Sequence, residues 1–125
     1  MPALPFALPI DELRVISPES AQAFRSLRDA VSAAGPLDQT TCELILIGSF
    51  VAQGHEIPLK TFASRLRQRG VALEALRQAV LVTFAASATL IQVTTALRWL
   101  DEVEAFLAAE SADGGDVAPS QQAAP

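Results

Sequence analysis

The sequence is poor in the side chains on which most enzyme mechanisms depend. It has one cysteine, Cys42, one histidine, His55, one tryptophan and no tyrosine. A single cysteine excludes disulfide exchange between two thiols of the same chain. There is no HExxH motif, no Cys-x-x-Cys motif and no glycine-rich phosphate loop, and His55, Glu56 and Glu43 are too few ligands to favour a metal. We therefore expect neither a metal nor a cofactor.

Charged residues are also few, and acidic ones outnumber basic ones. Only 18% of the residues are charged, and the formal net charge is -5. Such a charge repels nucleic-acid phosphates and anionic lipid, so we expect neither nucleic acid nor a membrane as a partner. Three arginines, Arg65, Arg67 and Arg69, are spaced by two, which scatters them around a helix and indicates a solvated face rather than an anion site.

The apolar content is high for so short a chain. Half of the 125 residues are apolar, slightly more than a single small domain needs for its own core, and this predicts self-association. Residues 78–97 carry no charge and approach the length of a membrane span, but polar side chains dilute them and a break at 87–89 favours two packed helices of a soluble protein. The first six residues lack the basic region of a signal peptide, so we expect a cytoplasmic protein.

Helix start and stop signals predict an all-α fold, a compact helical bundle of about five helices. Capping residues, prolines and glycines delimit the helical segments 17–35, 38–54, 58–70, 73–86 and 89–110. Residues 1–16, which include three prolines, are expected to form an N-terminal arm, and 17–110 form the domain. Residues 111–125 lack periodicity and apolar bulk, so we expect a disordered tail.

Two of these segments indicate contacts beyond a single chain. In the second, apolar residues nearly surround the helix between Leu44 and Val51, which predicts a buried helix and a homo-oligomer. In the fifth, Trp99 lies off the apolar seam, and we expect it to cover a partner subunit or the mouth of a pocket.

Three short stretches, whose spacings agree without gaps, together resemble the carboxymuconolactone decarboxylase and alkylhydroperoxidase D-like family. They are Leu37-Asp38-x-x-Thr41-Cys42-Glu43-Leu44-Ile45, then Gly54-His55-Glu56, then Gly70-Val71-x-x-Glu74-x-Leu76-Arg77-x-Ala79. The resemblance covers about residues 36–104. It implies an all-helical protomer that assembles into trimers or hexamers with pockets between subunits.

The resemblance also assigns positions to the candidate site. Glu43 matches the glutamate of the family's proton relay, and His55 stands where the first motif cysteine would be. Pro58 replaces the second cysteine, and Phe62 replaces the motif histidine. The missing cysteine pair excludes peroxidase activity, and the missing histidine removes a group that the decarboxylase branch retains.

The first functional hypothesis is a cofactor-free acid–base enzyme of isomerase, lyase or cyclase type. His55 would act as acid or base and Glu43 would orient its ring, because a carboxylate on the second nitrogen fixes the tautomer. The substrate would be a small, fairly apolar organic molecule. The residues expected to bind it are Phe62, Pro58, Glu56 and Trp99.

The second hypothesis is a catalytically silent relative that acts as an oligomeric binding or scaffold protein. In that case His55 caps a helix end or faces water, Glu43 makes a salt bridge between subunits, and Phe62 and its neighbours fill the pocket. The two hypotheses differ in one observable. Only the enzyme requires His55 and Glu43 to lie within hydrogen-bond reach of each other at an open pocket.

Overall fold

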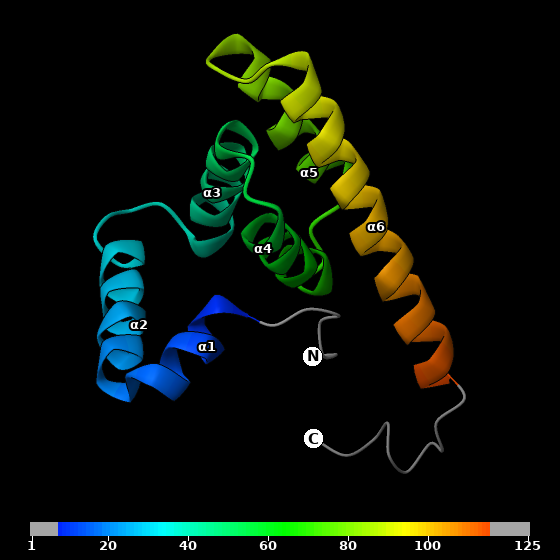
Figure 1. The fold of residues 1–125 in the computed structure, drawn as a ribbon. Helices are drawn as coiled ribbons and strands as arrows, with labels where there is room; N and C mark the ends of the chain where they lie inside the picture. Colours follow the sequence, from blue (N-terminus) through cyan, green and yellow to red (C-terminus); the bar gives the residue numbers. More distant parts are fainter. Residues whose placement is uncertain (1–7, 116–125) are drawn as a thin grey trace.

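The computed structural model describes residues 8–115, and this part of the chain is all-α, as predicted, without a β-strand. The helices follow one another in the order shown in Figure 1. They are α1 (Pro9–Ile16), α2 (Pro18–Ser32), α3 (Gln39–Gln53), α4 (Glu56–Gln68), α5 (Leu73–Leu81), the 3-10 helix η1 (Val82–Ala85) and α6 (Leu90–Gly115).

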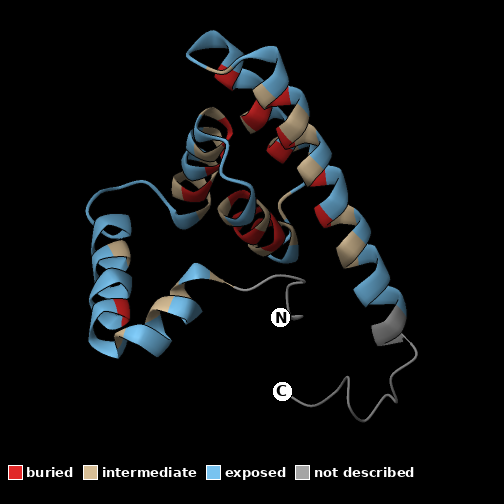
Figure 2. Ribbon diagram, viewed as in Figure 1, coloured by how far each residue is buried: buried red, intermediate tan, exposed pale blue. Residues whose placement is uncertain are grey.

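The hydrophobic core lies among α3, α4, α5 and α6, where the buried residues of Figure 2 are concentrated. Helix α4 contributes Leu59, Ala63 and Leu66, which are fully buried. These residues follow one another at four and three positions, the spacing that places side chains on one face of a helix. The side chains that complete the core are Ile47, Val51, Phe62, Leu76, Val80, Val93, Ala96, Leu100 and Val103.

Local signals set the helix ends where the sequence predicts them. The Asp38 carboxylate accepts a hydrogen bond from the Thr41 backbone N–H at 2.7 Å and so caps α3. Thr89 and Gln92 form a reciprocal capping box at the start of α6, with hydrogen bonds of 3.2 and 2.8 Å. Gly54 ends α3 with a φ of 71°, a left-handed conformation that glycine adopts without steric cost.

Sequence signals did not predict a helix within the N-terminal arm, residues 1–16, but the structure has one. Residues 9–16 form helix α1, which packs against α2. Pro9 stands at the first turn, followed by Asp11 and Glu12, and a proline there starts a helix instead of breaking it. Residues 1–7 of the predicted arm lie outside the described residues.

Two predicted helix ends are also corrected. The fourth predicted helix, 73–86, divides into α5 and η1, where Thr83 donates a hydrogen bond to the Val80 carbonyl and β-branched residues favour a tighter turn. Helix α6 continues to Gly115, past the predicted end near Glu110. Extending a formed helix costs less free energy than starting a new one, because each added residue gains one hydrogen bond. The rest of the predicted tail, 116–125, lies outside the described residues.

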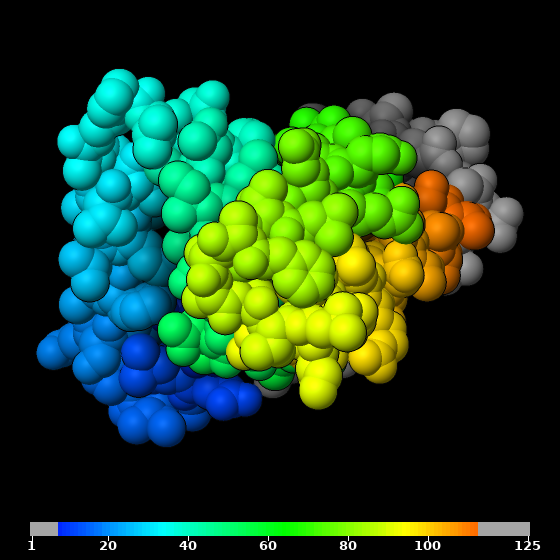
Figure 3. All heavy atoms as spheres, turned by 90° about the horizontal axis from the view of Figure 1, so that it is seen from above, coloured from blue at the N-terminus to red at the C-terminus, as the bar shows by residue number. Residues whose placement is uncertain are grey.

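Within a single chain, helix α3 is not buried all round. Within the chain it buries Glu43, Ile47 and Val51, while Ile45 is 58% exposed. Helices α1 and α2 lie to one side of α3–α6 (Figures 1 and 3), and Ala21 is the buried residue of α2. Among the described helices, none combines the length and apolar character needed to cross a membrane.

An ion pair joins α4 to α6. The Arg67 guanidinium donates two hydrogen bonds to the Glu104 carboxylate, at 2.9 and 2.6 Å, and a third to the Val71 carbonyl at 2.9 Å. The hydrogen bond from Arg67 holds the pKa of Glu104 below its ordinary value of 4.5. This two-pronged geometry is the strongest form of arginine–carboxylate pairing.

The low pKa of Glu104 predicts a pH-dependent contribution to stability. A carboxyl whose pKa is lower in the folded than in the unfolded state stabilises the fold above the unfolded pKa, and this contribution disappears as the pH falls through the folded value. Because both side chains remain partly exposed, we expect Glu104→Gln to cost only about 1 kcal/mol near neutral pH. Denaturant titrations of wild type and variant should show this difference shrinking towards about pH 3. Glu110→Gln, exposed on the same helix, is the control, and a pH-independent difference for Glu104→Gln would contradict the assignment.

Candidate functional site

Glu43 lies near the start of α3 and is held there by two neighbours. It is 7% exposed. The Gln39 amide donates a hydrogen bond to one carboxylate oxygen and the Arg69 guanidinium donates to the other, each at 3.0 Å. Arg69 follows directly on α4, so this pair ties the start of α3 to the end of α4. Both oxygens of the carboxylate therefore have structural partners.

His55 lies at the other end of α3, in the turn that leads into α4. Its side chain is exposed and makes no capping hydrogen bond, and its ring centroid is 6.3 Å from that of Phe50. At about 1.5 Å of helix rise per residue, the ten positions from Glu43 to the end of α3 at Gln53 amount to about 15 Å along the axis, and His55 follows beyond that end. The hydrogen bond expected between His55 and Glu43 is thus not formed within the chain.

The four residues expected to bind a substrate are spread over α4 and α6. Phe62 is buried, with its ring centroid 5.7 Å from that of Phe50. Pro58 is half-buried in the first turn of α4, and Glu56 is exposed and pairs with Lys60 at 2.7 Å. Trp99 on α6 is half-buried against the hydrophobic core. Phe62 thus belongs to the hydrophobic core of the chain.

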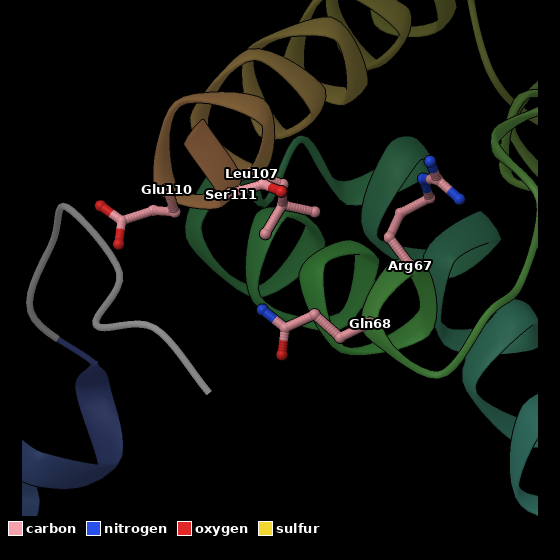
Figure 4. Close-up of a pocket in the computed structure, with 5 residues that line it drawn as sticks. All are labelled: Arg67, Gln68, Leu107, Glu110 and Ser111. Carbon is pink, nitrogen blue, oxygen red and sulfur yellow. The ribbon is translucent and has the colours of Figure 1, made fainter. Parts of the chain in front are cut away.

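A shallow hollow of about 380 Å³ lies between the end of α4 and α6 (Figure 4). Its lining residues are Arg67, Gln68, Leu107, Glu110 and Ser111. It contains neither His55 nor Glu43 nor any of the four expected substrate contacts, and the Arg67 guanidinium is engaged by Glu104. Over the part of the chain that the structure describes, no three His, Cys, Asp or Glu side chains gather in a way that could hold a metal ion.

Arginines cluster around Phe62, a feature that the sequence did not predict. The guanidinium carbons of Arg28, from α2, and Arg65, from α4, each lie 5.1 Å from the centroid of the Phe62 ring. Burial lowers the pKa of Arg65, and the positive charges of Arg28, Arg25 and Arg69 lower it further, whereas Glu43 acts in the opposite direction. Within residues 8–112, the ion pairs involve Arg69 but none of Arg25, Arg28 and Arg65.

The spacing of Arg65, Arg67 and Arg69 by two predicted a solvated face of α4, which the structure does not show. Arg67 turns towards α6 and pairs with Glu104, whereas Arg65 faces α2 through Phe62 and Arg69 faces α3 through Glu43. Arg65 and Arg69 are four positions apart and so share one side of the helix. The spacing of Arg65 and Arg69 could have indicated the arginine cluster from the sequence. The position of Arg28 on α2, however, depends on tertiary structure.

Comparison with known proteins adds no relative: no family model matches the chain, and neither a curated protein nor a solved structure matches it.

Proposed function

We propose that the chain is a homo-oligomeric binding or scaffold protein, and a divergent member of the carboxymuconolactone decarboxylase and alkylhydroperoxidase D-like family. The observation that carries this choice over an acid–base enzyme is the position of Glu43, which is paired with Arg69 and Gln39 at the opposite end of α3 from His55. An acid–base pair needs its two groups in hydrogen-bond contact, directly or through one water. The family assignment rests on the three sequence stretches that carry the resemblance.

The surface proposed for self-association is an end of the molecule whose residues carry no charged side chain. Residues 44–54 of α3 and 78–97, which run from α5 through η1 into α6, contain no charged side chain. We call this surface the charge-free end. Figure 3 shows the end of α5, η1 and the start of α6 forming a protruding part of the face seen from above. Its large exposed apolar residues are Ile45, Leu46, Leu81, Val82, Phe84, Leu90 and Ile91.

A second copy of the chain is the occupant that fits this end. At a net charge of -5, two copies repel each other, and they approach at least electrostatic cost where neither presents a charge. Removing exposed apolar side chains from water contributes about 25 cal/mol for each Å² buried. The same net charge opposes contact with anionic lipid. The resemblance adds the expectation of a trimer or a hexamer.

Light scattering coupled to size exclusion tests this assembly. We expect a mass of at least twice 13.2 kDa for the wild type, and a mass near 13.2 kDa for both Val82→Glu and Ile91→Glu. These residues are 59% and 77% exposed, so glutamate is tolerated in the free chain but not in an apolar contact. The control is Leu27→Glu, on α2 at 59% exposure, which should keep the wild-type mass. A monomeric wild type would refute self-association, and dissociation by Leu27→Glu alone would move the interface to α2.

A further inference from the structure

The basic residues of this acidic chain are distributed unevenly. Of its 9 lysines and arginines, Arg25 and Arg28 lie on α2, and Arg65 and Arg69 belong to the facing side of α4 and its C-cap. Among the described residues, Arg69 has the buried carboxylate of Glu43 as a partner. Burial lowers the pKa of Arg65, and the positive charges of Arg28, Arg25 and Arg69 lower it further.

Arg28 and Arg65 contact the same aromatic ring. Each guanidinium carbon is 5.1 Å from the Phe62 centroid, within the range of a cation–π contact. The Arg28 contact joins α2 to α4. A second cation against the same ring adds like-charge repulsion, and no carboxylate within residues 8–112 forms an ion pair with either arginine.

An apolar surface borders the two arginines. The Arg28 guanidinium also lies 5.8 Å from the centroid of the Phe24 ring, and Phe24 is 48% exposed. Arg28 and Arg65 are half-buried, so part of each side chain remains accessible while the surroundings strengthen electrostatic attraction. Cation donors next to an exposed aromatic ring suit a molecule that has one anionic group and an apolar body.

We propose that Arg28 and Arg65 bind the carboxylate of a small organic anion whose apolar body lies against Phe24. The arginine fork matches the two oxygens of a carboxylate and supplies hydrogen bonds as well as charge. A polyanion is disfavoured because the chain as a whole is acidic. This site is separate from the charge-free end and does not depend on self-association.

Isothermal titration calorimetry with benzoate tests the site on the full chain. We expect benzoate to bind once per chain, benzamide, its neutral analogue, to bind at least tenfold more weakly, and inorganic phosphate to bind more weakly than benzoate. Arg28→Gln and Arg65→Gln should each weaken benzoate binding at least tenfold, because each removes a charge-assisted contact. The matched control is Arg98→Gln, exposed on α6, which should bind as the wild type does.

Two further variants separate binding from structural support. Arg65→Lys keeps the charge but loses the fork, so it should fall between the wild type and Arg65→Gln, and Phe24→Ala should weaken benzoate without changing the affinity for phosphate. Circular dichroism confirms that each variant is folded before it is titrated. Equal affinities for wild type, Arg28→Gln and Arg65→Gln, or no benzoate binding at millimolar concentration, would overturn the proposal. Tighter binding of phosphate than of benzoate would overturn the assignment to an organic carboxylate.

Discussion

Leu66→Ala should lower the free energy of unfolding by about 2–5 kcal/mol, the range for removing a large side chain from a packed core. Leu66 is fully buried on α4. It belongs to the cluster that joins this helix to residues of α3, α5 and α6. Alanine would leave a cavity there, and surrounding side chains held by helices on several sides can fill it only in part. Urea denaturation followed by circular dichroism measures the loss.

Leu27→Ala is the matched control for this substitution. Leu27 is 59% exposed on α2, so the same chemical change removes little buried surface, and alanine has at least the helix propensity of leucine. We expect a change within about 0.5 kcal/mol. A cost for Leu66→Ala as small as that for Leu27→Ala would show that α4 is not the centre of the core.

The helix boundaries were predictable because the signals that set them are local. Asp38, Gly54 and Thr89 act through the backbone within a few residues, and the structure places each of them at a helix end. Helix α1 was not predicted because a proline such as Pro9 is compatible with two local structures. Proline interrupts a helix from inside but favours its first turn, and the acidic residues that follow Pro9 indicate the second.

The candidate site was less predictable, since it depends on how helices pack. The separation of Glu43 and His55 follows from helix geometry, because ten positions of continuous α-helix lie between Glu43 and the end of α3 at Gln53, and His55 follows beyond that end. In an antiparallel pair of helices, a residue at the start of the first instead meets one at the end of the second, as Glu43 meets Arg69. The approach of Arg28 to Phe62 depends on the docking of α2, for which no local pattern exists.

Glu43→Gln is the second substitution expected to have a large effect, a loss of about 1–3 kcal/mol in the free energy of unfolding. The carboxylate is 7% exposed and accepts hydrogen bonds from Gln39 and Arg69. Glutamine removes the charge that Arg69 faces and replaces one acceptor oxygen by a donor. The loss stays below that for a fully buried pair because the Arg69 side chain is 34% exposed and can turn to water.

A double-mutant cycle shows which residue Glu43 works with. Combining Glu43→Gln with Arg69→Gln should give an interaction energy of at least about 0.5 kcal/mol, as expected for residues in direct contact. Combining Glu43→Gln with His55→Ala should be additive within about 0.5 kcal/mol, because the two side chains lie at opposite ends of α3. Strong coupling to His55 would mean that the two residues meet across a subunit contact, and the acid–base enzyme would then become the better proposal. Coupling to Arg69 alone fits a structural glutamate, which is what a binding or scaffold protein requires.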